Sequence, residues 1–153
     1  MRKETPARPF WQWKSLKEMT VREWESLCDG CGRCCLTKLQ DAESGGLHYT
    51  DAACRLLDLK LCRCRHYAQR TELIPDCVSL SPQNLPRIEW LPISCAYRRI
   101  AEGRGLAWWH PLVSGSGATV HQAGISVRGK AISEDALTTD LLEDHIIDWV
   151  EHD

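Results

Sequence analysis

Four of the chain's nine cysteines fall within eight residues, in the sequence Cys28-Asp-Gly-Cys31-Gly-Arg-Cys34-Cys35. Two cysteines separated by two residues can bind one metal ion, because the intervening residues let the chain turn tightly around it. A glycine lies inside each of these steps, where a positive φ costs little. A disulfide between the neighbours Cys34 and Cys35 would strain the peptide. Buried thiols can also pack as small apolar side chains, but four at this spacing indicate metal chelation.

The other cysteines follow at wider intervals: Cys54, Cys62, Cys64, Cys77 and Cys95. Their separations of 8, 2, 13 and 18 residues do not match a two-knuckle zinc ribbon. They are compatible with one site, or two neighbouring sites, built from several loops. We expect Cys64 and Cys77 to be ligands. Tyr67 is expected to pack nearby and Arg70 to lie near anionic sulfur, with plain surface positions as the alternative for both.

A helix is predicted just before the cysteine loop. The capping box Thr20-Val-Arg-Glu23 predicts that it runs over about residues 21–28. Apolar side chains recur at helical spacing at Val21, Trp24 and Leu27, which predicts one buried face. Such a helix would carry the first cysteine of the loop on its buried side.

Turn signals dominate the rest of the cysteine-rich part. We expect residues 29–46 to form a turn-rich ligand loop and Leu47–Thr50 to form a short strand. Four prolines exclude long helices over residues 61–95. Ser94 is expected to cap a helix over about 95–103, which two glycines would end.

The last third differs, since no cysteine follows residue 95. Three short strands are expected there: Leu106–Val113, Thr119–His121 and Ile125–Arg128. A closing helix is predicted over about Asp140–Val150 from its apolar spacing, with Thr138 or Thr139 as its cap.

Length and composition indicate one α+β domain of 153 residues. We predict a single domain, 1–153, made of an N-terminal arm (1–19), a cysteine-cluster region (20–95) and an α+β region (96–153). The first half is expected to be irregular and metal-binding. The second is expected to contain short strands and a C-terminal helix.

Charge and hydropathy limit the partners and the compartment. The net charge of −2 argues against a dedicated nucleic-acid binder without excluding one, and an unknown protein partner is left open. The chain has no apolar signal region and no stretch approaching the roughly 18 apolar residues of a membrane span. We therefore expect a cytoplasmic protein with no membrane partner. In that reducing compartment, nine cysteines indicate metal or catalysis rather than disulfides.

These motifs resemble the CxxCxxCC family of zinc- or iron-chelating bacterial proteins, and its YcgN branch in particular. The resemblance rests on the CxxCxxCC run, Ala53-Cys54-Arg-Leu-Leu, Cys64-x-x-Tyr67-x-x-Arg70, Cys77, Pro92-x-x-Cys95-Ala-Tyr97-Arg, Trp109-His110-Pro-Leu-Val-Ser-Gly115, His121-x-Ala-Gly-Ile-Ser-Val and Asp144-His145-Ile-Ile. It implies eight metal ligands: Cys28, Cys31, Cys34, Cys35, Cys54, Cys64, Cys77 and Cys95. It leaves Cys62 out and implies no reaction.

The cofactor predicted from these thiols is an iron–sulfur cluster or zinc. CxxCxxC is the spacing of the first three ligands of a bacterial [4Fe–4S] run, whereas zinc accepts almost any tetrahedral thiolate set. Eight thiolates suffice for two four-thiolate sites, or for one cluster and a second ion. With either metal, the thiolate ligands leave the site with a net negative charge. Five arginines beside or near the candidate ligands can offset it: Arg33, Arg55, Arg63, Arg65 and Arg70.

Two functions remain open. In the first, an iron–sulfur centre serves redox chemistry, sensing or an enzyme; in the second, structural zinc shapes a binding module for protein or nucleic acid without catalysis. The chain lacks GxSxG, P-loop, dinucleotide-binding and HExxH motifs. Its thiols are clustered rather than set apart with a base, so no catalytic residue is predicted. The histidines are expected to be structural, and Trp108-Trp109 to be core rather than a stacking platform.

Overall fold

The computed structural model describes residues 8–75, 77–137 and 141–152, in which all elements are short. The strands are β1 (Leu36–Gln40), β2 (Leu47–Ala53), β3 (Leu57–Asp58), β4 (Arg63–Cys64) and β5 (Ile132–Ser133). The α-helices are α1 (Phe10–Trp13), α2 (Val21–Ser26), α3 (Arg70–Leu73), α4 (Ala96–Ala101), α5 (Pro111–Ser114) and α6 (Thr119–Gln122). Six 3₁₀ turns cover Leu16–Glu18, Arg33–Cys35, Tyr67–Gln69, Leu85–Arg87, Glu134–Ala136 and Leu142–His145. The α+β class is confirmed.

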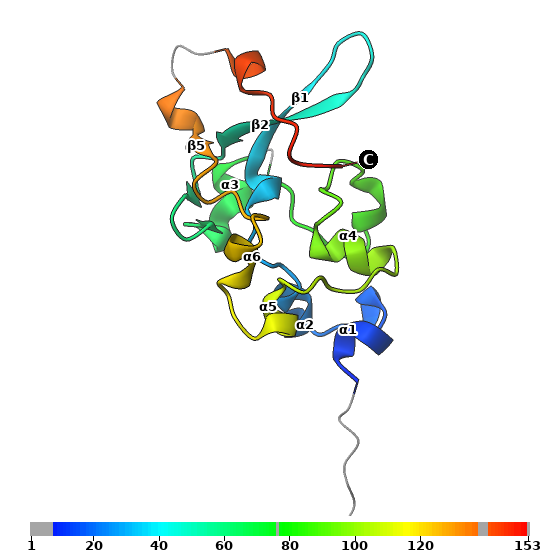
Figure 1. The fold of residues 1–153 in the computed structure, drawn as a ribbon. Coiled ribbons are helices and arrows are strands. Elements are labelled where there is room, and N and C mark those ends of the chain that lie inside the picture. Colours follow the sequence, from blue (N-terminus) through cyan, green and yellow to red (C-terminus); the bar gives the residue numbers. More distant parts are fainter. Residues whose placement is uncertain (1–7, 76, 138–140, 153) are drawn as a thin grey trace, which may run out of the picture.

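Strands β1 and β2 form an antiparallel hairpin in which Lys38 is paired with Tyr49. Strand β5 joins β2 in parallel, while β3 and β4 form a separate antiparallel pair. The strand predicted at Leu47–Thr50 is confirmed and continues to the end of β2. The prediction of a loop over all of 29–46 is wrong, because β1 lies within it and β2 supplies its hydrogen-bonding partner. The hairpin lies at the opposite end of the molecule from α1 and α2 (Figure 1).

Two clusters of buried side chains form the core. The first surrounds the sheet and contains Leu36, Tyr49, Ala53, Leu57, Cys62, Val127 and Val150. The second contains Leu27, Leu85, Leu91 and Tyr97, with Phe10 and Trp11 of α1 packed against it. Leu27 and Leu36 stand directly before and after the CxxCxxCC loop, and neither is more than 1% exposed. The loop therefore joins the two clusters, with one end fixed in each.

Helix α2 begins at the predicted capping box. Thr20 Oγ1 accepts the N–H of Glu23 at 3.1 Å, and the N–H of Thr20 donates to Glu23 Oε1 at 2.9 Å. Trp24 and Leu27 pack in the second cluster as predicted. The prediction of a buried Val21 is wrong, since that side chain is 81% exposed at the start of a helix of only six residues.

Replacing Thr20 by alanine is expected to lower the free energy of unfolding by about 1 kcal/mol, because the cap is lost. Equilibrium unfolding in guanidinium chloride measures this difference. The matched control is Val21→Ala on the same helix, which is expected to change stability by less than about 0.5 kcal/mol. Equal losses in the two variants would contradict a stabilising cap.

Residues 61–95 contain no helix longer than four residues in their described part, as the prolines predict. The helix predicted over about 95–103 is present as α4, but its N-cap is Cys95 instead of Ser94. The hydroxyl of Ser94 instead accepts a hydrogen bond from Arg33 Nη1 at 3.1 Å. Across the described ranges, no helix is long and apolar enough to cross a membrane.

Helices replace two of the predicted strands in the last third. The strand predictions for Leu106–Val113 and Thr119–His121 are wrong, since α5 and α6 form there. Pro111 stands at the first position of α5, where its fixed φ suits a helix start. His110 Nδ1 caps this helix by accepting the N–H of Leu112 at 3.0 Å.

The strand predicted at Ile125–Arg128 is also wrong. The backbone there turns, and the N–H of Val127 donates to the carbonyl of Cys31 at 2.8 Å. This bond fixes the cysteine loop to a segment nearly one hundred residues further along the chain. The strand of this region is β5, which pairs with β2 a few residues later.

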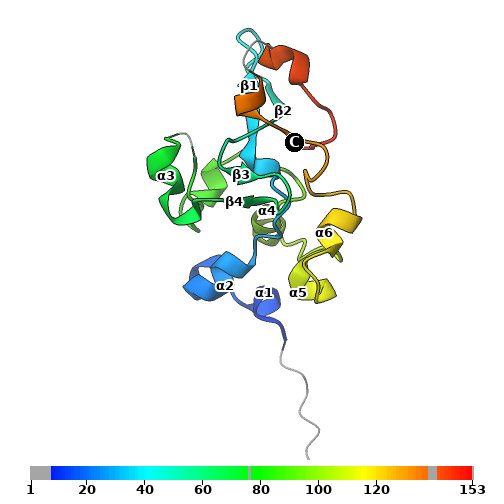
Figure 2. The ribbon, with the colours of Figure 1, turned by 90° about the vertical axis from the view of Figure 1, so that its left-hand side faces the viewer.

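The closing segment is largely extended, so the helix predicted over about Asp140–Val150 is wrong. After the 3₁₀ turn at Leu142–His145, Ile146 pairs with Thr50 of β2, and the next N–H donates to the carbonyl of Tyr49 at 2.9 Å. The segment runs from the sheet towards α4 (Figures 1 and 2), where the carbonyl of His152 accepts a hydrogen bond from Arg98 Nη1 at 2.6 Å. Three residues of this prediction lie outside the described part of the chain: Thr138, Thr139 and Asp140.

Candidate metal centre

The CxxCxxCC loop is held by its own backbone as well as by its ends. Gly32 has φ 76°, and a Cβ added there would lie 2.9 Å from Val127 Cγ2, so both conformation and space favour glycine. The N–H of Arg33 points at Cys31 Sγ, at 3.5 Å. A backbone N–H directed at sulfur stabilises a thiolate, as a metal-binding loop requires.

Four thiols form a first group: Cys28, Cys31, Cys34 and Cys95. Burial raises the pKa of Cys28 to about 12, with smaller contributions from the charges of Cys34 and Cys95. Burial also raises the pKa of Cys31, where Cys34 and Cys28 again contribute. Cys28 and Cys34 are nevertheless accessible to solvent. These two thiols are thus surrounded by protein on most sides and open on one.

The other four predicted ligands form a second group: Cys35, Cys54, Cys64 and Cys77. The N–H of Cys54 donates to the carbonyl of Cys35 at 2.8 Å, which places the two residues side by side. Cys64 lies in β4 opposite Leu57 of β3, next to the turn that Cys54 begins. Burial raises the pKa of Cys77, and the charges of Cys54 and Cys64 add to the increase. The eight predicted ligands thus divide into two groups of four.

The two groups meet at the adjacent pair Cys34 and Cys35. The thiol of Cys35 donates to Cys34, which is the largest cause of a pKa of about 7 at Cys34 and of a raised pKa at Cys35. The charge of Lys38 lowers the pKa of Cys34 further. Cys34 also acts electrostatically on Cys77 of the second group.

Lys38 is a cation at this junction that the sequence did not reveal. Its Nζ donates to the carbonyls of Cys34 at 2.9 Å and Leu36 at 2.7 Å, and lies 4.3 Å from the ring centroid of Trp90. Burial lowers the pKa of Lys38, while the neighbouring thiols counteract that shift. Although Lys38 lies in β1, its side chain reaches back to the cysteine loop. The spacing of charged residues in the sequence did not predict this contact.

Asp29 is a second residue that sequence reasoning missed. It is 7% exposed, and its Oδ1 accepts the N–H of Cys31 at 3.1 Å. Its Oδ2 accepts the indole N–H of Trp109 at 3.3 Å. Its charge raises the pKa of Cys28, Cys31 and Cys95, although less than burial does. The first group therefore contains a carboxylate among its thiols.

The arginines predicted to offset the negative charge of the thiolates do not all contact the cysteines. Arg70 counteracts the burial that raises the pKa of Cys77, and its guanidinium lies 3.8 Å from the ring centroid of Tyr67. Arg55 acts in the same way on Cys54. The guanidinium of Arg33 donates to the hydroxyl of Ser94 and to the carbonyl of Ile125.

Cys62, His110 and His121 have partners other than the eight predicted ligands. Cys62 is 3% exposed in the first core cluster, where Arg128 and Ser126 are the side chains that influence its pKa, below the effect of burial. Both ring nitrogens of His110 are engaged, one with the carbonyl of Leu27 and one with the cap of α5. His121 Nδ1 pairs with Ser126 Oγ at 2.6 Å.

The donor chemistry fits a thiophilic metal, since the available donors are cysteine sulfurs, with Cys35 packed against the first core cluster and Cys95 against the second. All nine cysteines are free thiols. Among the residues that the structure describes, no three Cys, His, Asp or Glu side chains are arranged to hold one metal ion. The thiols are thus grouped without converging on a single point.

This α+β fold, with a cysteine loop between two cores and grouped thiols, defines a cysteine-cluster protein. Residues 27–96 match the CxxCxxCC family, described as "Putative zinc- or iron-chelating domain". The chain belongs to the UPF0260 family of bacterial proteins, whose members match nearly its whole length.

The relatives include a UPF0260 protein of Gluconacetobacter diazotrophicus, 63% identical over 95% of this chain and 89% of the relative. One from Granulibacter bethesdensis is 58% identical over 95% and 86%. Another from Parvibaculum lavamentivorans is 56% identical over 92% of each chain. No solved structure matches the chain.

Proposed function

We propose that this protein is a cytoplasmic iron–sulfur protein with a redox or sensing role. Its eight grouped cysteines would be the ligands, four for each of two neighbouring centres. The first centre would use Cys28, Cys31, Cys34 and Cys95; the second would use Cys35, Cys54, Cys64 and Cys77. An iron–sulfur cluster bound there would supply one-electron chemistry.

The observation that carries this proposal is the grouping of thiols without convergence. Four thiolates around one zinc ion stand about 3.8 Å apart, because each bond is about 2.3 Å and the geometry is tetrahedral. In a [4Fe–4S] cluster each cysteine binds a different iron, so the sulfurs stand further apart. In the described part of the chain, a backbone hydrogen bond brings Cys54 beside Cys35, yet no three thiols are placed around one point, and this arrangement suits the larger cluster better.

The cations around the thiols support the same proposal. Four thiolates on a cluster leave a negative centre that nearby positive charges stabilise. Lys38 lies beside Cys34 and Cys35, and Arg70 beside Cys77. The two proposed centres would therefore each have a cation close to at least one of their ligands.

Purification without oxygen is expected to give a brown protein containing iron and acid-labile sulfide. Its broad visible absorption should bleach on reduction. Iron, sulfide and zinc are measured per chain beside the spectrum. A colourless protein with near-stoichiometric zinc, and no iron after anaerobic reconstitution, would overturn the proposal in favour of a zinc site.

A further inference from the structure

A cavity of about 300 Å³ lies beside the first cysteine group. Its lining includes Arg33, Ser94, Arg99, Trp109, Trp149 and Glu151. Arg33 and Ser94 are the chain neighbours of Cys34 and Cys95, and Trp109 is hydrogen-bonded to Asp29. Two arginines and two tryptophans thus meet in one hollow. Nothing in the proposed metal binding uses them.

Arg33 supplies a buried positive charge at this cavity. The residue is 7% exposed, and its Nε donates to the carbonyl of Ile125 at 2.7 Å and its Nη1 to Ser94 Oγ at 3.1 Å. Both acceptors are neutral. Within the described residues, no carboxylate forms an ion pair with Arg33. Buried charges are normally paired, so this guanidinium favours an anion in the cavity.

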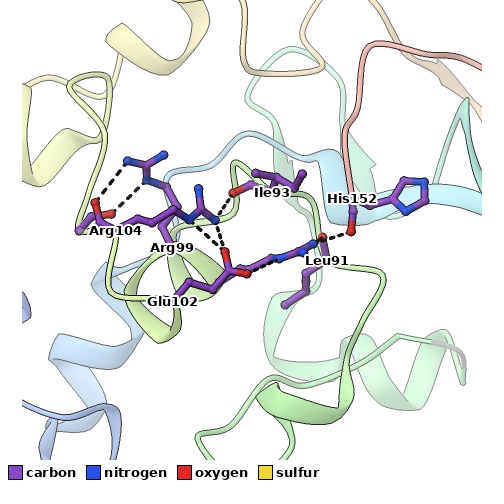
Figure 3. A network of polar contacts seen from close by, with 8 residues as sticks. Leu91, Ile93, Arg99, Glu102, Arg104 and His152 are labelled. Atoms are coloured by element: carbon purple, nitrogen blue, oxygen red, sulfur yellow. Dashed lines mark hydrogen bonds and ion pairs between the residues drawn. The ribbon is translucent and has the colours of Figure 1, made fainter.

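Arg99 is the second positive group, and it differs from its two arginine neighbours. Arg98 and Arg104 both form ion pairs with Glu102, at 3.3 and 2.5 Å (Figure 3). Arg99 instead donates to the carbonyls of Gly105 at 3.0 Å and Arg104 at 3.5 Å. Burial lowers the pKa of Arg99, and the charge of Arg104 adds to this. Across the described ranges, Arg99 also forms no ion pair with a carboxylate.

The two tryptophans give the cavity flat apolar surface. Trp109 is held in place by its bond to Asp29. The guanidinium carbon of Arg33 stands over the ring of Trp149, 5.7 Å from the centroid of that ring. Glu151 also lines the cavity. The two arginines and this one carboxylate together give the lining a net charge of +1. One flat anion would therefore match both the charge and the apolar walls.

We propose that this cavity binds a small aromatic carboxylate. The carboxylate would lie at Arg33 and Arg99, each of which has one guanidinium nitrogen that the hydrogen bonds given above do not use, Nη2 of Arg33 and Nη1 of Arg99. The ring would lie against Trp109 and Trp149. The volume of about 300 Å³ limits the ligand to a small molecule. The proposal concerns the cavity alone and holds whichever metal the cysteines bind.

Titration calorimetry of the purified full chain with benzoate tests the proposal. Saturable binding is expected, at least roughly tenfold tighter than that of neutral benzamide or of inorganic phosphate. Arg99→Gln should weaken benzoate binding roughly tenfold or more. The matched control, Arg22→Gln, removes an exposed arginine of α2 and should leave the affinity for benzoate unchanged.

Three results would overturn the proposal: no saturable binding of benzoate, equal binding of benzamide, or equal binding of phosphate. The comparison of ligands uses the unaltered protein, so it does not depend on the folding of any variant. Unfolding curves of Arg99→Gln show whether its fold is intact. Unchanged affinity in a folded Arg99→Gln variant would equally contradict the assigned anion contact.

Discussion

Replacing Cys95 by alanine should remove about half of the bound metal, and replacing Cys64 by alanine should remove the other half. These residues belong to different proposed groups, and each supplies one of four ligands. Alanine is chosen because a serine oxygen can still bind iron. Metal and sulfide per chain are measured after anaerobic purification. The double variant should contain almost no metal.

Cys62→Ala is the matched control for these variants. It removes a thiol that lies only two residues from Cys64 but packs in the first core cluster. Its metal content should equal that of the unaltered protein, although its stability should fall by about 1 kcal/mol. Complete metal loss in both single variants would contradict the assignment of two centres and favour one cluster that both residues share. Metal loss in Cys62→Ala would contradict the ligand assignment itself.

Removing the metal with a chelator under reducing conditions is expected to lower the free energy of unfolding by about 4 kcal/mol or more. The proposed ligands come from segments that lie far apart along the chain. The stretch from β4 to Cys77 is the clearest case, because Tyr67 and Leu73 are 50% and 43% exposed. We therefore expect metal bound by Cys64 and Cys77 to strengthen its attachment, beside the hydrogen bonds of Tyr67 to Glu25 and of Arg55 to the carbonyl of Leu73. Guanidinium unfolding with and without metal measures the loss.

Limited proteolysis locates the same effect within the chain. Trypsin should cut the metal-free protein first beside Arg65 and Arg70, which lie in this stretch. Lys14, whose Nζ pairs with Glu23 Oε1 at 2.7 Å outside the cysteine groups, serves as the internal control, and cleavage beside it should not change. Equal stability and equal cleavage patterns with and without metal would show that the metal does not hold these loops.

Local signals in the sequence predicted those elements that depend on near neighbours. The capping box at Thr20 starts α2 because both of its hydrogen bonds lie within four residues. The strand from Leu47 is likewise present. The closing segment was mispredicted, since Ile146 pairs with Thr50, almost one hundred residues earlier. Helical spacing of apolar residues does not exclude an extended chain packed against a sheet.

The candidate site shows the same division. Spacing indicated a metal-binding loop at CxxCxxCC, and the resemblance to the family supplied the eight predicted ligands without Cys62, whereas Lys38 and Asp29 went unnoticed. Lys38 reaches Cys34 because β1 turns back over the loop, and Asp29 is buried because Trp109 covers it. The contact of Asp29 with Trp109 joins residues eighty positions apart, whereas Lys38 is only four residues from Cys34 and its direction depends on how β1 leaves the loop.

The sequence by itself determined the donors: the type and number of the thiols, and the adjacency of Cys34 and Cys35. Only the tertiary structure decided which later cysteines join each of them. Cys54 stands beside Cys35 because its N–H bonds to the Cys35 carbonyl, and Cys95 joins the first group because α4 packs beside the second core cluster. Cysteines in loops have no periodicity that records their neighbours. Long-range backbone bonds and core packing place them.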